Sequence, residues 1–233
     1  FKYIYCRGRE NIYFLNINFT TMKDLSDFRI SYEKYNLSEN SISKDPLSLF
    51  KNWFDEICDS KQVKEPNAMT LSTVDSQNTP TNRVVLLKKF SEKGFVFYTN
   101  YESRKGKSIA NNPNVCISFF WPSHERQVII KGSCKLLSDK ESDKYFYSRP
   151  KDSQIGAVAS DQSKEIPNRK FIEDKFRLLN ESKSKITRPK HWGGIIVSCD
   201  SIEFWQGRKN RLHDRILFDK DKKNNWVYKR LSP

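Results

Sequence analysis

Apolar and polar residues alternate along most of this chain in short runs of the kind that form β-strands. Such runs, rich in β-branched and aromatic residues, lie at 68–74, 83–90, 94–98, 115–121, 127–137, 191–199, 201–206, 214–218 and 226–230. Most of them follow one another without a long helix between them. The pattern predicts a mainly β fold with accessory helices, and it favours an antiparallel barrel over a parallel, doubly wound sheet.

Fewer segments have the capping residues and spacing that predict α-helices. Asp45 and Pro46 are typical of an N-cap and a first helical residue, and apolar residues follow at helical spacing as far as Cys58. Ser138 and Glu141 have the spacing of a capping box, and the helix that they begin ends before Pro150. Segments 104–111 and 167–180 are predicted as two further helices.

The length of 233 residues suits one domain, and the aromatic content of 13% is ample for its core. We expect the domain over 45–233, a preceding segment at 22–44, and an extension outside the fold at 1–21, with Met22 as a candidate initiator. No apolar run approaches the roughly 20 residues that a membrane span needs. The five cysteines show no C-x-x-C spacing, so we expect no metal site, no disulfide framework and a cytoplasmic location.

The chain is strongly basic, with 42 Lys and Arg residues against 28 Asp and Glu residues and a net charge of +14. Such a charge raises nucleic acid as a partner, which a basic barrel binds by stacking bases on aromatic side chains. The basic residues are scattered, however, and no run of five or more occurs. Small phosphorylated ligands would account for part of the excess charge.

The densest candidate chemistry is Arg211-Leu-His-Asp-Arg215, which follows a strand-like run. On an extended chain, Arg211, His213 and Arg215 point to the same face, and three such donors need an anionic or electron-rich partner. A solvated edge strand is the alternative for this segment alone. Three more short basic clusters lie at 83–88, 103–105 and 145–153. Four clusters in one small protein suggest two phosphate sites.

These segments, taken in order, resemble the pyridoxine/pyridoxamine 5′-phosphate oxidases. The matching segments are 83–88, 97–100, 103–105, 125–128, 145–156, 162–163, 192–194, 202–215 and 230–233. The resemblance therefore runs from about Asp27 to Pro233. It implies a split β-barrel that forms a homodimer, with flavin mononucleotide (FMN) in the dimer interface.

The resemblance also implies which residues hold FMN, some of them supplied by the second subunit. Arg83, Ser103, Arg104 and Lys105 belong to the phosphate region, with Thr99 alongside. The other residues of the implied cofactor site are Val84, Val85, Leu86, Tyr98, Gln127, Gln162, Ser163, Trp205 and Arg215. Taken alone, Arg104 and Lys105 are equally typical of a helix start on the surface.

The substrate that the resemblance implies is a phosphorylated pyridine. Lys88, Tyr145, Arg149 and Ser153 would hold its phosphate. Their chemistry suits the task, because a guanidinium fork, a point charge and two hydroxyls match the lone pairs of that group. No nucleic acid and no membrane would take part.

Arg211 and His213 are the implied catalytic residues and would lie over the pyridine ring. His213 could orient the substrate or accept a proton, and the sequence leaves both roles open. Arg29 and Tyr32 match the segment that covers the site in the family. The implied reaction oxidises the 4′ carbon of pyridoxamine or pyridoxine 5′-phosphate by hydride transfer to flavin N5. Dioxygen would reoxidise the flavin to give hydrogen peroxide, and the product would be pyridoxal 5′-phosphate.

Three alternatives stay open. The protein could be another split-barrel flavin oxidoreductase, a pyridoxal phosphate carrier without turnover, or a basic nucleic-acid-binding barrel. The phosphate residues weigh against the first, and the Arg211/His213 pair weighs against the second. Arg208 adds a charge directly after Gly207, and we hypothesise that it alters the preference between the two substrates.

Overall fold

The computed structural model describes residues 23–182 and 184–233, so the expected extension at 1–21 and Met22 lie outside the described residues. The chain divides into two compact units, Phe1–Ser31 and Tyr32–Pro233. The second unit holds all the helices and strands given below. Residues 32–44, which were expected to precede the domain, belong to this same unit.

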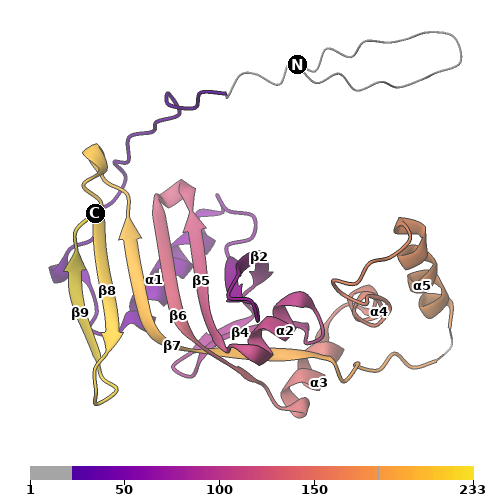
Figure 1. Ribbon diagram of the computed structural model, residues 1–233. Coiled ribbons are helices and arrows are strands. Elements are labelled where there is room, and N and C mark those ends of the chain that lie inside the picture. Colours follow the sequence, from indigo (N-terminus) through magenta and orange to yellow (C-terminus); the bar gives the residue numbers. More distant parts are fainter. Residues whose placement is uncertain (1–22, 183) are drawn as a thin grey trace, which may run out of the picture. The chain divides into compact units, whose positions relative to one another are not determined.

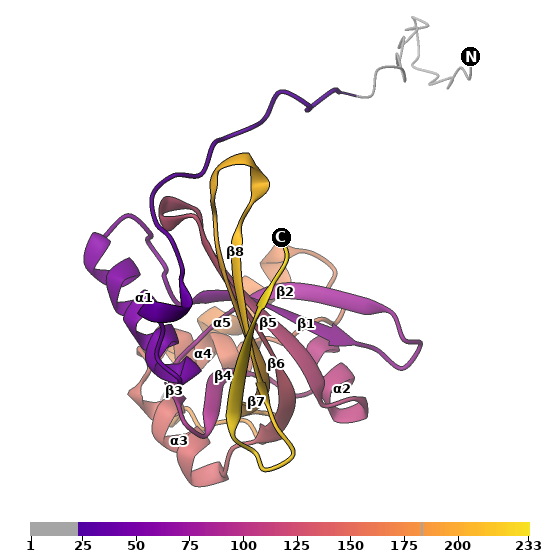
Figure 2. The ribbon, with the colours of Figure 1, turned by 90° about the vertical axis from the view of Figure 1, so that its left-hand side faces the viewer.

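A nine-stranded sheet forms the body of the second unit (Figure 1). Its order is β2-β1-β5-β6-β7-β4-β3, with β8 paired to β7 and β9 paired to β8 (Figure 2). The strands are β1 Ala68–Val74, β2 Pro80–Leu86, β3 Lys89–Ser91, β4 Gly94–Asn100, β5 Asn114–Trp121, β6 Arg126–Leu136, β7 Trp192–Gln206, β8 Asp214–Lys220 and β9 Trp226–Leu231. Every pairing among these strands is antiparallel, which confirms the predicted sheet type.

Strand β7 corrects one prediction, because segments 191–199 and 201–206 are a single strand rather than two. The interruption is a β-bulge at Asp200: Lys131 pairs with Ser201, whereas Gly132 pairs with Cys199. A Cβ on Gly132 would lie 2.1 Å from the Ser198 carbonyl oxygen, so the close approach requires glycine there. The bulge lets one strand pair with β4 in its first half and with β8 in its second half.

The predicted strand at 83–90 is also wrong, because it is divided between β2 and β3. Leu87 and Lys88 lie between β2 and β3 and belong to neither strand. The Leu87 N–H donates to the Asn67 carbonyl at 2.8 Å, and the Lys88 N–H donates to the Val96 carbonyl at 2.8 Å. The chain therefore crosses from β1 to β4 at this point, and Lys88 lies at the crossing.

Five α-helices accompany the sheet in the described part of the chain. They are α1 Pro46–Ser60, α2 Arg104–Asn111, α3 Asp139–Ser148, α4 Lys151–Ala159 and α5 Arg169–Glu181. Asp45 caps α1 by accepting from two backbone N–H groups, and Ser138 forms a capping box with Glu141 at α3, as predicted. Helix α4 was not predicted; its N-cap residue, Pro150, offers no side-chain hydrogen bond that would have announced a helix.

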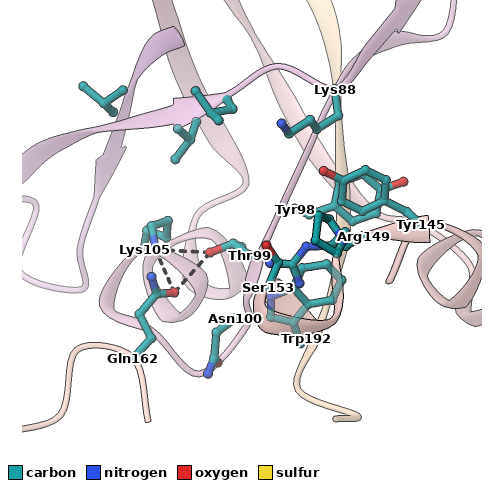
Figure 3. A pocket seen from close by; sticks show the side chains of 14 residues that line it. Lys88, Tyr98, Thr99, Asn100, Lys105, Tyr145, Arg149, Ser153, Gln162 and Trp192 are labelled. Carbon is teal, nitrogen blue, oxygen red and sulfur yellow. Dashed lines mark hydrogen bonds between the residues drawn. The ribbon is translucent and has the colours of Figure 1, made fainter. Parts of the chain in front are cut away.

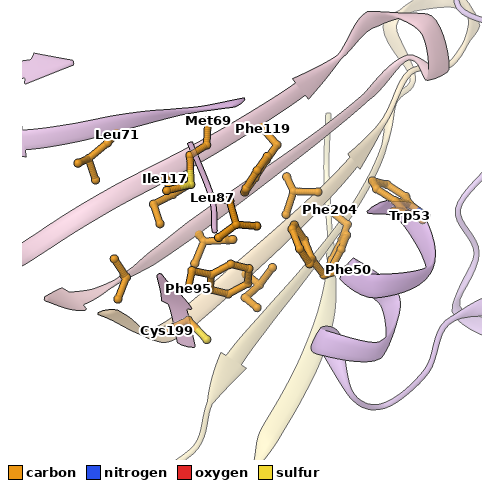
Figure 4. Packing of buried hydrophobic residues seen from close by; sticks show 14 of the residues in the cluster. Phe50, Trp53, Met69, Leu71, Leu87, Phe95, Ile117, Phe119, Cys199 and Phe204 are labelled. Carbon is orange, nitrogen blue, oxygen red and sulfur yellow. The ribbon is translucent and has the colours of Figure 1, made fainter. Parts of the chain in front are cut away.

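The core lies between α1 and the sheet (Figure 4). Phe50 of α1 packs edge-on against Phe95 at 5.0 Å, and Trp53 packs edge-on against Phe204 at 5.2 Å. Alternate residues of the strands point to this core, so the residues between them lie on the opposite face of the sheet. None of the described helices is both long and apolar enough to span a membrane.

Candidate functional site

A cavity of about 480 Å³ opens where β2, β4 and the α3–α4 corner meet (Figure 3). Its size suits a small-molecule ligand. The residues that line it are Val84, Val85, Leu86, Lys88, Tyr98, Thr99, Asn100, Lys105, Tyr145, Arg149, Pro150, Ser153, Gln162 and Trp192. Three of them are cations and none is a carboxylate, so the cavity suits an anion.

Lys105 is the most buried of the three cavity cations, with 8% of its surface exposed. Its Nζ donates to Thr99 Oγ1 at 3.1 Å and Gln162 Oε1 at 3.2 Å (Figure 3). It also donates to Ser103 Oγ at 3.2 Å. All three acceptors are neutral. Burial, and secondly the nearby Arg83 guanidinium, lower the pKa of Lys105 to about 8. A buried ammonium without a counter-ion favours the arrival of an anion.

Arg83 and Arg104 add to the positive charge at the start of α2. Arg83 does not line the cavity; its Nη1 donates to the Leu71 carbonyl at 3.0 Å and to Thr73 Oγ1 at 2.8 Å. Burial and the neighbouring Arg104 lower the pKa of Arg83. Ser103 is the N-cap of α2, and its hydroxyl accepts from the Gly106 N–H. The helix N-terminus therefore adds its own partial positive charge to this corner.

Arg149 closes the other end of the cavity, at the C-cap of α3. Its guanidinium lies 4.7 Å from the centre of the Trp192 ring. Its Nη1 is buried and has no hydrogen-bond partner in the described part of the chain, and burial lowers the pKa of the group. Tyr145 stacks on Tyr98 at 3.7 Å and forms the adjoining wall. An unpaired donor in a guanidinium fork is suited to an oxyanion.

The cavity thus brings together most of the residues predicted on β2, β4, α3 and α4. Three of its residues, Asn100, Pro150 and Trp192, were not predicted as site residues. Trp192 had a signal, because it opens the Trp-Gly-Gly motif at 192–194. Asn100 had a similar signal, because it ends the matching segment at 97–100, and Pro150 was predicted only to end the preceding helix.

A second group of predicted residues lies elsewhere, in a row across the sheet. Gln127 of β6 pairs with Trp205 of β7, and Trp205 pairs with Arg215 of β8. The three residues are half-buried, and they alternate with core residues. They therefore share the sheet face that is turned away from the core. We call them the sheet row; among the described residues that line the cavity, none belongs to it.

The loop after β7 carries the predicted catalytic pair. Arg211 ends a 3₁₀ turn at Lys209–Arg211 and has a φ of 60°, so it is not extended. The prediction that Arg211, His213 and Arg215 share one strand face is therefore wrong, because β8 begins only at Asp214. The His213 ring lies 4.7 Å from the Trp205 ring and 5.9 Å from the Tyr32 ring.

The electrostatic setting of this loop differs from that of the cavity. His213 Nδ1 accepts a hydrogen bond from the Arg208 backbone N–H at 3.1 Å. Burial, followed by the charge of Arg211, lowers the pKa of His213. Arg215 Nε donates to Glu203 Oε1 at 2.7 Å, and this bond raises the pKa of Arg215. His213 of the loop and Arg215 of the sheet row thus have partners within the chain.

Two further predicted residues do not line the cavity. Ser163, next to Gln162, has a left-handed backbone with a φ of 73°. Arg29 lies in the first unit, where its Nε donates to the Ser26 carbonyl at 3.0 Å.

Two models of known protein families match this chain, one after the other along the sequence. Residues 60–183 match the family model described as pyridoxamine 5′-phosphate oxidase. Residues 192–233 match the pyridoxine 5′-phosphate oxidase C-terminal dimerisation region. The chain belongs to the pyridoxamine 5′-phosphate oxidase family. Most of the cavity residues of this family member fall in the first matched region, whereas Trp205, Arg211, His213 and Arg215 fall in the second.

Members of the family from several bacteria are similar over almost the whole chain. The pyridoxine/pyridoxamine 5′-phosphate oxidase of Flavobacterium psychrophilum is 51% identical, over 91% of this chain and 100% of its own. That of Flavobacterium johnsoniae is 53% identical, over 91% of this chain and 100% of its own. Coverage of this extent includes both the cavity and the sheet row.

A solved structure supports the fold of this oxidase-family chain. PhzG from Burkholderia lata 383, crystallised with tetrahydrophenazine-1-carboxylic acid, is 27% identical and has a TM-score of 0.78. The match covers 83% of this chain and 95% of that one. The predicted split barrel is thereby confirmed.

Proposed function

We propose that the protein is an FMN-dependent oxidase of pyridoxamine 5′-phosphate and pyridoxine 5′-phosphate. Dioxygen is the electron acceptor, and the products are pyridoxal 5′-phosphate and hydrogen peroxide. The observation that carries this proposal is the cavity with Lys88, Lys105 and Arg149 in its wall and no carboxylate. The family assignment then selects a phosphorylated cofactor and a phosphorylated substrate from among possible anions.

The residues present fit FMN at the α2 end of the cavity. Lys105 has no acidic partner among the described residues, and Arg83, Arg104 and the N-terminus of α2 gather around it. We assign the FMN phosphate to this corner, with Ser103 and Thr99 as neutral partners. When bound, FMN supplies a two-electron acceptor that dioxygen regenerates.

Strand β2 is suited to border the flavin ring. It is hydrogen-bonded only to β1 among the described strands, so one of its edges keeps unpaired N–H and C=O groups. Val84, Val85 and Leu86 line the cavity. Their backbone groups would bond ring heteroatoms while their side chains exclude water. Tyr98 and Gln162 would complete this wall.

The substrate phosphate fits the Arg149 end of the cavity. The buried, unpartnered Nη1 of Arg149 marks where an oxygen acceptor belongs. Lys88, Tyr145 and Ser153 line the same cavity and offer an ammonium and two hydroxyls. Two anion positions in one cavity would hold the substrate ring close to the flavin ring, as direct transfer between them requires.

We propose further that a second copy of the chain completes the site. Within one chain, the sheet row and the loop with Arg211 and His213 do not contribute to the cavity lining. The outward face that carries the row also exposes Phe120, the cross-strand neighbour of Gln127, to 54%. A homodimer that covers this face would bring the row of one subunit to the FMN of the other. Arg211 and His213 would then reach the substrate ring, beside Tyr32, whose ring already packs near that of His213.

The test is an absorbance spectrum of the purified protein, followed by addition of pyridoxamine 5′-phosphate without oxygen. We expect flavin bands that bleach with substrate and return with air, because the cofactor then accepts two electrons and passes them to dioxygen. A yellow protein that does not bleach would point to another split-barrel flavin oxidoreductase. A colourless protein that FMN does not reconstitute would contradict the proposal and favour the nucleic-acid-binding alternative.

A further inference from the structure

The hydrogen bond between the Arg208 backbone and His213 decides which ring nitrogen of His213 can face a ligand. A backbone N–H can only donate, so His213 Nδ1 must accept in the 3.1 Å contact. A nitrogen that accepts in this way carries no proton. In the neutral ring the proton therefore lies on Nε2, and Nε2 can donate but cannot accept.

Most of the groups around the ring also disfavour a second proton on it. Arg211 and the Arg208 N–H both oppose a second proton on the imidazole, and burial does so too. Only Asp214 favours the charged ring, and that carboxylate is engaged by Arg230 Nη1 at 2.9 Å and by the Leu37 N–H at 3.0 Å. Tyr32, which packs beside the ring, brings a neutral phenol.

The two residues before Arg208 hold its backbone N–H in place. The Gly207 N–H donates to the Glu125 carbonyl at 2.7 Å. The Gln206 side chain is fully buried and donates to the His124 and Glu125 carbonyls, each at 3.1 Å. Arg126 Nε donates in turn to Gln206 Oε1 at 3.0 Å. The residues before Arg208 are thus fixed to the β5–β6 turn, which fixes the direction of its N–H.

We propose that His213 acts on the substrate as a hydrogen-bond donor through Nε2–H and does not serve as the proton acceptor of the reaction. This inference deepens the proposed function and rests on it for the identity of the ligand. It decides between the two roles that the sequence leaves open. Arg208 is the positioning residue, and it acts through its backbone rather than through its charged side chain.

The first test reads the tautomer directly. The FMN-loaded protein is labelled with ¹⁵N in its three histidines, and the His213 resonances are identified by their loss in His213→Gln. We expect an unprotonated Nδ1 and a protonated Nε2 at neutral pH, with and without bound product. A protonated Nδ1 in either state would overturn the inference. This readout needs no turnover, so it holds even if the proposed substrates are not oxidised.

The second test compares substitutions that keep different parts of the imidazole. His213→Gln places an amide N–H near the Nε2 position, His213→Glu places a proton acceptor there, and His213→Asn keeps only an acceptor for the Arg208 N–H. We expect His213→Gln to retain kcat/KM within roughly tenfold of the natural enzyme, and the other two to lose a further 10-fold or more. Higher activity of His213→Glu than of His213→Gln would contradict the donor role.

Flavin content and circular dichroism of the three variants show whether each is folded. If His213→Gln fails to fold, the activities of His213→Asn and His213→Glu still decide between the two roles. If His213 is a general base, His213→Glu should be more active than His213→Asn; if His213 is a hydrogen-bond donor, it should not be. If the natural enzyme oxidises neither vitamer phosphate, the proposed function fails, while the tautomer measurement still confirms or refutes the assignment of His213.

Discussion

Among the described residues, Lys105 and Arg149 of the cavity have no acidic partner, whereas Arg215 of the sheet row and His213 of the loop are already bonded within the chain. Lys105 bonds only neutral oxygens and Arg149 has an unpaired Nη1, and burial lowers the pKa of both groups. Arg215 is paired with Glu203, which raises its pKa. His213 receives the Arg208 N–H. The cavity therefore presents unneutralised positive charge to an anion, whereas hydrogen bonds already hold the sheet row and its loop in fixed orientations.

Because of this difference, we expect substitutions in the two regions to change the stability of the ligand-free protein in different ways. Unpartnered buried charge lowers the stability of the ligand-free protein, and an arriving phosphate reverses the penalty. Paired groups stabilise the fold whether or not a ligand is present. Substitutions in the cavity should therefore separate stability from activity, and the predictions below use that separation.

Replacing Arg149 with Met should have the largest effect. Loss of the guanidinium fork should reduce kcat/KM for pyridoxamine 5′-phosphate by roughly 30- to 1,000-fold, about 2–4 kcal/mol. The ligand-free protein should unfold at the same or a higher denaturant concentration, because a buried unsatisfied donor is removed. Arg188→Met is the matched control: this arginine, whose side chain is 7% exposed, pairs with Asp139 and Asp143. Loss of Arg188 should destabilise the fold. If Arg149→Met and Arg188→Met destabilise it equally, the proposed difference between unpaired cavity cations and paired cations is contradicted.

A mixed dimer tests whether the two regions meet across subunits. Arg149→Met and Arg211→Met chains, each nearly inactive alone, are co-expressed with different affinity tags, and the heterodimer is purified. If one site combines the cavity of one subunit with the loop of the other, one of the two sites is intact and about half of the natural activity returns. A heterodimer as inactive as its parents would show that each chain builds its own site.

The pKa of Lys105 gives a pH-dependent prediction. The unfolded chain holds this proton up to about pH 10.5, and the folded, ligand-free chain releases it near pH 8. The unfolded state then binds more protons between these values, so the free energy of unfolding should rise with pH, by up to about 3 kcal/mol. Urea titrations at several pH values should show this rise in the natural chain and not in Lys105→Met. Lys107→Met, on the exposed side of the same helix, should keep it.

The smallest effect is expected at Arg208. Its side chain is 40% exposed, and it lies 3.3 Å from the Tyr35 carbonyl and 3.6 Å from Asp214. Arg208→Gln should change the ratio of rates on pyridoxine and pyridoxamine phosphates by no more than about threefold, because exposed ion pairs contribute little. The backbone N–H to His213 is unaffected. An unchanged ratio would refute the hypothesis that Arg208 influences substrate preference.

Local patterns in the sequence predicted much of the fold and less of the site geometry. Strand β1 and helix α2 match their predicted ranges, because alternation and helix-start signals are properties of neighbouring residues. The division at Leu87 and the bulge at Asp200 depend on partners that are distant in sequence, so no local pattern contains them. The 3₁₀ turn that ends at Arg211 was missed because it needs left-handed residues without a glycine signal.

Strand β7 begins at Trp192 in the cavity and reaches Trp205 in the sheet row. A single backbone of 15 residues, about 50 Å if extended, thus sets the offset between the two half-sites that each copy would contribute. Deleting or inserting one residue beyond Asp200 would turn every later side chain to the opposite face and change the offset in both halves of a dimer at once. Length variation in this strand should therefore be far less tolerated than equally sized changes in the β8–β9 turn, which touches neither half-site.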